Sequence, residues 1–213
     1  MKIFKKILIV FTLLSIFIYI SAFSYVDKVS TDLQECIFRL HIVANSNSME
    51  DQALKFKIRD NIINYMNTIC YNAKNKLDAM RIAKEHSEDF YKIAKSTVED
   101  FGFSYDVSLN FGNFDFPTKY YGDICLPAGN YDALKIELGN ASGQNWWCVM
   151  FPPLCFVDIS SGIVPDESKE ILQNTFSNKE EFILINEEKS SDIKLKFKLF
   201  EMFNDIKIKT AKK

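Results

Sequence analysis

A long apolar run opens the chain. After three lysines near the N-terminus, no charged residue lies between Ile7 and Val26. An uncharged run of about twenty residues is near the length of helix that crosses a bilayer. Lysines before such a run are typical of an export signal whose N-terminus stays in the cytoplasm, and small residues permit cleavage after Ser24. We therefore predict a signal peptide or N-terminal membrane anchor over residues 1–26, followed by one exported domain over residues 35–213.

Residues 35–45 follow a short polar linker and carry the β-prone apolar residues Ile37, Phe38, Leu40, Ile42 and Val43, which predict a strand. Successive side chains of a strand point to opposite faces, so Arg39 and His41 would lie opposite Leu40 and Ile42. Asn45 extends this polar row at the end of the strand. The row is either a solvent-facing or helix-covered part of the framework, or a surface that binds a partner.

Two helical patterns follow. Apolar residues recur at spacings of three and four at Leu54, Ile58, Ile62, Tyr65 and Ile69, which predicts an amphipathic helix. Ser48 and Asp51 stand where a capping box would begin that helix. A second helix is expected from about residue 76 to residue 101, with Gly102 in the position that ends many helices. In that helix His86 is expected at the surface.

The period then changes from helix to strand. Alternating apolar residues predict strands at residues 103–111 and 134–138, with a turn at residues 126–131. Residues 145–150 are expected to pair with 134–138 as a hairpin. Residues 166–176 and a later stretch favour helix, while residues 192–205 fit strand and helix equally. The order predicts an α+β fold, in which an export or transmembrane helix precedes a mixed or antiparallel sheet with helices packed on it.

The segment from Gly143 to Asp158 concentrates the unusual residues of the chain. Trp146 and Trp147 would point to opposite faces of a strand, so one can enter the core while the other stays available. The prolines that follow prevent the strand from continuing as a central strand. The segment is therefore either packed core or a binding face, whose members would be Trp146, Trp147, Pro152, Pro153 and Leu154. Cys148 and Cys155 flank the turn and are a candidate disulfide, which export would permit.

Charge and composition exclude several functions. The formal net charge is −2, and it becomes −5 once the three lysines of the export segment are removed. A mildly acidic exported domain is not expected to bind nucleic acid. The chain has two histidines and no short zinc-binding or phosphate-binding motif, so we expect no metal and no cofactor. A cysteine nucleophile assisted by His41 is the catalytic alternative, and nothing near Cys148 in the sequence supports it.

Two long blocks of sequence resemble a known family. Phe38–Ile62 ("FRLHIVANSNSMEDQALKFKIRDNI") and Leu126–Asp158 ("LPAGNYDALKIELGNASGQNWWCVMFPPLCFVD"), together with the N-terminal export segment, are similar to stage II sporulation protein R of endospore-forming Firmicutes. The resemblance spans nearly the whole exported region. It implies a protein that is made in the forespore and exported across the forespore membrane to the intermembrane space.

The resemblance also implies a role. Members of that family trigger a membrane-bound aspartic protease of the mother cell, which then processes the precursor of sigma factor E. The chain would therefore be an activating ligand and not an enzyme, with the protease as its partner and the N-terminal segment as its contact with the membrane. No catalytic residues carry over. The alternatives are an exported cysteine-dependent hydrolase or a module that binds the cell wall.

Overall fold

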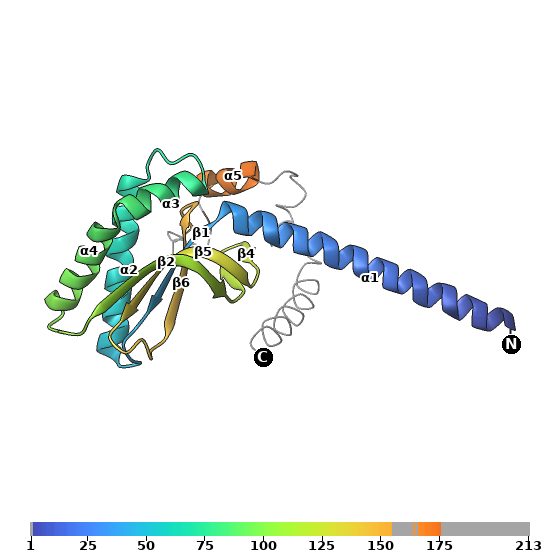
Figure 1. Cartoon of the computed structure of the whole chain (residues 1–213), viewed down its shortest axis with the longest axis horizontal. Coiled ribbons are helices and arrows are strands. Elements are labelled where there is room, and N and C mark those ends of the chain that lie inside the picture. The colour runs from blue at the N-terminus through green and yellow to red at the C-terminus, as the bar shows by residue number, and fades with distance from the viewer. Residues whose placement is uncertain (1, 155–163, 165, 176–213) are drawn as a thin grey trace.

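The computed structural model describes residues 2–154, 164 and 166–175, and Figure 1 shows the arrangement of their helices and strands. The helices are α1 (Lys2–Cys36), α2 (Met49–Ile69), α3 (Lys76–Glu85), α4 (Ser87–Asp100) and α5 (Asp166–Thr175). The strands are β1 (Phe38–Val43), β2 (Val107–Phe116), β3 (Lys119–Tyr121), β4 (Ile124–Leu126), β5 (Gly129–Leu138) and β6 (Asn145–Phe151). The predicted α+β class is confirmed.

Helix α1 projects from the body of the protein, as Figure 1 shows. Its segment Ile3–Ser21 has a mean hydropathy of 2.2 and none of it is buried, so it is long and apolar enough to cross a membrane. The polar linker predicted between this segment and the domain is absent, because α1 continues without a break to Cys36. The last part of the helix enters the body, where Leu33 and then Ile37 are fully buried.

The four-stranded sheet has the order β2-β5-β1-β6. Strand β1 runs parallel to β5 and antiparallel to β6, so the sheet is mixed. The hairpin predicted between residues 134–138 and 145–150 is therefore wrong, because β1 lies between those two strands. Residues 139–144 cross the end of β1 instead, and the Gly143 N–H donates a hydrogen bond to the Ala44 carbonyl at 2.9 Å. Strands β3 and β4 form a separate two-stranded sheet.

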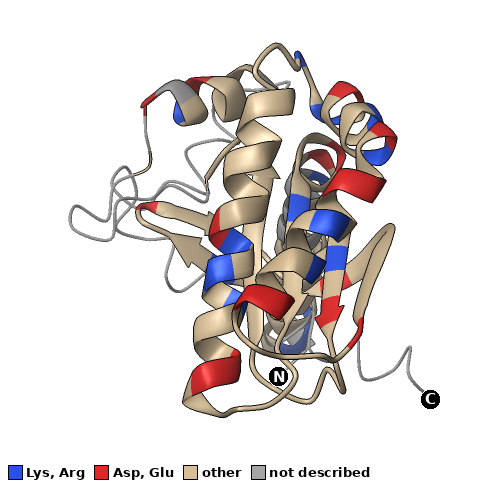
Figure 2. Ribbon diagram, turned by 90° about the vertical axis from the view of Figure 1, so that its left-hand side faces the viewer, with Lys and Arg blue, Asp and Glu red and all other residues tan. Residues whose placement is uncertain are grey.

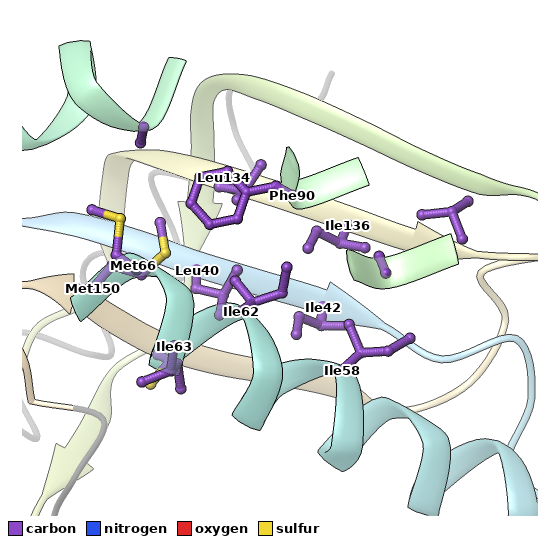
Figure 3. Packing of buried hydrophobic residues seen from close by; sticks show 14 of the residues in the cluster. Leu40, Ile42, Ile58, Ile62, Ile63, Met66, Phe90, Leu134, Ile136 and Met150 are labelled. Carbon is purple, nitrogen blue, oxygen red and sulfur yellow. The ribbon is translucent and has the colours of Figure 1, made fainter. Parts of the chain in front are cut away.

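One face of the four-stranded sheet carries the helices α2, α3 and α4 and the apolar core. In Figure 3 Leu40 and Ile42 of β1 point toward Ile58 and Ile62 of α2. All four side chains are fully buried, so each contributes about 1.5–3 kcal/mol relative to an exposed position. Helix α2 begins where the sequence predicts, since the Ser48 Oγ accepts a hydrogen bond from the Asp51 N–H at 3.1 Å.

The helix predicted over residues 76–101 is two helices, because the chain turns at His86 between α3 and α4. The His86 Nδ1 lies 2.8 Å from the Tyr65 Oη and 2.9 Å from the Asp89 Oδ2. Gly102 follows α4 with a φ of 79°, as its predicted capping position requires. Figure 2 shows charges of both signs spread over the helical layer.

The predictions for the segments after residue 102 were confirmed in part. The strand expected at residues 103–111 begins at Val107 and continues to Phe116, and α5 confirms the helix expected from residue 166. Residues 192–205 lie outside the described residues. The opposite face of the sheet, which we call the second face, is covered in part by the end of α1, by β3 and β4, and by Leu154, Val164 and Leu172.

Candidate partner-binding site

Arg39 lies at the centre of the covered part of the second face and is fully buried. Its guanidinium carbon stands 4.0 Å from the ring centre of Phe116, 4.8 Å from that of Tyr131 and 5.9 Å from that of Tyr121. We call these three rings the aromatic cage. Arginine over aromatic faces is a favourable cation–π arrangement, which strengthens when water is excluded. The polar row predicted from the sequence is thus buried at Arg39 and does not reach a partner there.

Hydrogen bonds fix the guanidinium within the cage. The Arg39 Nη2 donates to the Tyr121 Oη at 2.6 Å, and its Nε donates to the Cys148 carbonyl at 3.4 Å. The Tyr121 hydroxyl in turn donates to the Trp147 carbonyl at 3.1 Å. Burial raises the pKa of Tyr121, although the nearby Arg39 works in the opposite direction. Among the described residues, no carboxylate lies within ion-pair distance of Arg39, and its Nη1 has no hydrogen-bond partner.

His41 is the next residue of the polar row, and its ring stacks against the ring of Trp147. The two rings stack with centres 3.8 Å apart and planes 20° apart. The His41 Nε2 lies 2.8 Å from the Asn145 Oδ1, which can only accept, so this nitrogen carries the proton. Burial lowers the pKa of His41; the hydrogen bond to Asn145 opposes that shift, while the positive charge of Lys135 adds to it. The imidazole is therefore neutral and serves to seat Trp147.

Asn45 belongs to a different cluster, on the loop before α2. Its Oδ1 accepts from the Asn140 N–H and its Nδ2 donates to the Asp51 Oδ2, both at 2.9 Å. A side chain at Gly139, whose φ is 53°, would collide with that same Oδ1. Burial works to raise the pKa of Asp51, but hydrogen bonds from Ser46 and Asn45 help to hold it below its ordinary value. Asn45 thus fastens the loop over the end of β1.

The turn after β6 is largely packed inside the protein, as the first of the two alternatives left open by the sequence expects. Pro152 is buried, Leu154 is fully buried and Pro153 is half-buried. The Ser168 Oγ of α5 donates to the Pro153 carbonyl at 2.8 Å, so α5 closes over the turn. Cys148 is disulfide-bonded. Cys155, the partner suggested by the sequence, lies outside the described residues, so that pairing stays a prediction.

The two tryptophans point to opposite faces of β6, as predicted. Trp146 lies on the helical face, where its ring meets Phe56 edge-on at 5.3 Å and the Arg59 guanidinium lies 4.5 Å from its centre. Trp147 lies on the second face and meets Phe116 at 4.8 Å. Both side chains are half-buried.

The second face changes character beyond Trp147. Asn145 is exposed, while Trp147, Lys135 and Glu137 are half-buried. The Lys135 Nζ and the Glu137 Oε1 form an ion pair at 2.6 Å. We call these four residues the open half. It offers one aromatic surface bordered by an amide and by charges of both signs.

Two comparisons with known proteins bear on this arrangement. Residues 34–161 match the family model described as Stage II sporulation protein R (spore_II_R). The stage II sporulation protein R of Bacillus subtilis (strain 168) is 39% identical over 183 residues, which cover 79% of this chain and 80% of that protein. The chain belongs to the stage II sporulation protein R family. No solved structure matches it significantly.

The region matched by the stage II sporulation protein R family model runs from the buried end of α1 through β6. It therefore includes the aromatic cage, the open half and the loop held by Asn45. The membrane-length part of α1 and the helix α5 lie outside it. What the family model describes is the sheet, its helical layer and both parts of the second face.

The thiols of this family member are poorly suited to nucleophilic catalysis. Burial raises the pKa of Cys36 to about 11, with Asp32 and Glu35 adding to the shift, and burial with Asp78 does the same for Cys70. A nucleophilic cysteine needs a lowered pKa. Cys125 is almost fully buried and Cys148 is oxidised. The described residues contain no group of three or more potential ligands for a metal.

Sequence reasoning missed the aromatic cage. Phe116, Tyr121 and Tyr131 stand on three different strands, and nothing in their spacing associates them with Arg39. The available signal was an arginine inside a largely apolar strand, since a buried charge must find partners elsewhere in the fold.

Proposed function

We propose that this protein is a secreted intercellular signal of endospore formation. In this proposal it is exported from the forespore and activates, by binding, the membrane-embedded aspartic protease of the mother cell that processes pro-sigma-E. The observation that carries the proposal is the family membership together with the unburied apolar helix Ile3–Ser21. A helix of that length and composition before a folded domain is suited to export or to membrane anchoring.

The geometry of the would-be catalytic groups supports binding over chemistry. His41 is stacked on Trp147 and hydrogen-bonded to Asn145, so one face of its ring and one of its nitrogens are already engaged within the protein. Two thiols have raised pKa values, which disfavours a cysteine-dependent hydrolase. A ligand requires only a surface that prefers the active state of its partner over the inactive state.

Trp147 is the residue of the predicted contact set that lies in the open half, where a partner could reach it. Of the candidates on the second face, Arg39 and His41 are buried, whereas Trp147 keeps part of its ring accessible beside the exposed Asn145. Tryptophan is enriched among the residues that dominate binding energy. The stack on His41 holds the Trp147 ring in one orientation before binding, which reduces the entropy lost on association.

Reconstitution tests the proposal. The full chain is produced together with the protease and pro-sigma-E in cells that are not sporulating, and cleavage of pro-sigma-E is followed by immunoblot. Cleavage should require both this chain and its export segment. Cleavage that proceeds equally without the chain, or that is absent although all three proteins are present and the chain is exported, would rule the proposal out.

Trp147→Ala locates the contact within the same experiment. We expect a loss of cleavage of roughly tenfold or more, because an interface tryptophan commonly contributes 2 kcal/mol or more. Trp146→Ala is the matched control, since it removes an equally half-buried indole from the same strand on the helical face. Equal cleavage by the wild type and by Trp147→Ala would show that the contact lies elsewhere.

A further inference from the structure

Strand β2 forms one edge of the four-stranded sheet and is ten residues long. It pairs along its whole length with β5, from Val107 opposite Leu138 to Phe116 opposite Gly129. Within the described residues, β5 is the one strand paired with it. An edge strand presents a row of unpaired backbone N–H and C=O groups, which is a template for another strand.

Strand β2 has few of the usual protections of an edge strand, since Asp115 is its one charged residue. Proteins blunt exposed edges with lysines, prolines, bulges or very short strands. Residues 104–116 contain neither lysine, arginine nor proline, and the pairing with β5 is continuous without a bulge. A long regular edge of this kind persists in a soluble domain most readily when something else covers it.

Apolar side chains border the edge on both faces of the sheet. Leu109 and Phe111 are half-buried at the rim of the helical core, and Phe114 is half-buried on the second face. The Phe114 ring lies close against Gly112, where an added Cβ would meet it at 3.3 Å. A strand added beside β2 would cover all three apolar groups while pairing its own backbone.

The charges of β2 specify the strand that fits. Asp106 precedes the strand and Asp115 lies near its other end, and both are exposed. A second copy of β2 paired antiparallel about its centre would place Asp106 of one chain diagonally across from Asp115 of the other, and a shift of two residues would place them directly opposite. Like charges across a strand pair are destabilising, whereas a partner strand with a basic residue toward each end is attracted.

We propose that the edge of β2 facing away from β5, which no described residue pairs with, receives an extended segment of another polypeptide by strand addition, and that this segment has apolar residues on both faces and Lys or Arg at its ends. Strand addition gives affinity through main-chain hydrogen bonds and specificity through side chains at alternate positions. The surface differs from the open half, which consists of side chains of β5 and β6 on the second face, whereas the edge of β2 offers backbone groups in the plane of the sheet. The inference extends the proposed binding function but does not depend on which protein the partner is.

A peptide probe tests the edge directly. The probe is a strand-length peptide with alternating valine and threonine and a lysine at each end, N-methylated along one edge so that it cannot pair with itself. It is titrated onto the full chain in lipid nanodiscs, and backbone amide exchange of residues 107–116 is followed. We expect saturable binding that slows the exchange of the outward-facing amides of β2. Unchanged exchange at saturating probe would overturn the proposal.

A charge swap makes the test specific. The Asp106→Lys, Asp115→Lys variant should lose roughly tenfold in affinity for the lysine-ended peptide and gain as much for a glutamate-ended one at low salt. Circular dichroism checks that the variant is folded, since the Asp115 Oδ1 accepts a hydrogen bond from the Asn130 Nδ2 at 3.0 Å. Equal affinities of both chains for both peptides would overturn the charge assignment. If the wild type forms concentration-dependent dimers that the probe dissociates, the occupant of the edge is a second copy of this chain. That result would also overturn the charge assignment.

The same variant is then placed in the reconstituted cleavage system. Wild-type chain that triggers cleavage while the charge-swapped chain does not would connect the edge to signalling. If the wild type itself fails to trigger cleavage, the proposed function fails, and the peptide results still decide the strand-addition proposal. If both chains trigger cleavage equally, the edge has no part in signalling and the inference that it extends the proposed function is wrong.

Discussion

The two faces of the four-stranded sheet are buried by different kinds of contact. On the helical face Leu40 and Ile42 pack against α2 in a core that is almost entirely aliphatic and aromatic. On the second face Arg39 is buried as completely as Leu40, its neighbour in the chain. The helical face is closed along its length, whereas the second face is closed around Arg39 and open beyond Trp147.

This difference separates stability from recognition. A continuous apolar face stabilises the fold through burial, which is insensitive to small changes in direction. In the aromatic cage, by contrast, hydrogen bonds of the Arg39 guanidinium and the Tyr121 hydroxyl fix the orientation of the side chains. The edge-on contact between Phe116 and Trp147 connects the cage to the partly exposed tryptophan ring. Directional contacts hold the ring that the proposed partner would meet, while burial of apolar side chains beneath the helical layer stabilises the fold.

The largest effect on folding is expected from Leu40→Ala. The side chain is fully buried beneath α2, and such a truncation removes apolar surface and leaves a cavity, so we expect a loss of about 2–5 kcal/mol in the free energy of unfolding. Chemical denaturation followed by circular dichroism measures it. A loss below about 1 kcal/mol would contradict a rigid core on the helical face.

Arg39→Met tests the second face at the adjacent position and should have a smaller effect. Methionine keeps most of the apolar stem and removes a buried charge that has no carboxylate partner among the described residues, and replacing buried ionic groups by apolar ones is often neutral. We expect the free energy of unfolding to change by less than about 1.5 kcal/mol. Arg39→Ala, which also empties the cage, is the comparison and should lose more. A loss for Arg39→Met as large as that for Leu40→Ala would mean that the guanidinium contacts outweigh its desolvation.

The smallest effect is expected from the pH dependence at His41. Its pKa in the folded protein lies below the ordinary value of 6.5, chiefly because of burial. The unfolded chain therefore binds the proton more readily, so stability is complete above about pH 6.5 and falls as the pH drops toward the folded pKa. His41→Gln should lack this fall. Unfolding free energies of both chains between neutral and mildly acidic pH provide the measurement; parallel curves would show that burial does not shift the pKa of His41.

Local patterns in the sequence predicted several elements well. The alternation along β1 placed Leu40 and Arg39 on opposite faces, and the spacing of apolar residues identified α2 together with its Ser48 cap. The opposite directions of Trp146 and Trp147 also followed from strand geometry alone. Each of these features depends on neighbours within a few residues, where backbone geometry sets which side chains share a face.

Pairing between distant segments was predicted poorly. The expected hairpin failed because β1, about a hundred residues earlier in the chain, enters between β5 and β6. The single helix over residues 76–101 failed because a turn at His86 directs α4 onto α2, with Tyr65 of α2 in hydrogen-bond contact. The residues within each segment do not distinguish the observed structures from the hairpin and the single helix that were predicted.

The sequence by itself determined the membrane-length helix, the α+β class and which side chains of β1 and β6 share a face, because hydrophobicity and backbone period act over short distances. The tertiary structure alone decided the strand order, the burial of Arg39 in the aromatic cage and the position of the half-buried Trp147 ring at the open half. Those depend on which distant segments meet, and the free energy that selects such contacts arises only when the chain is packed.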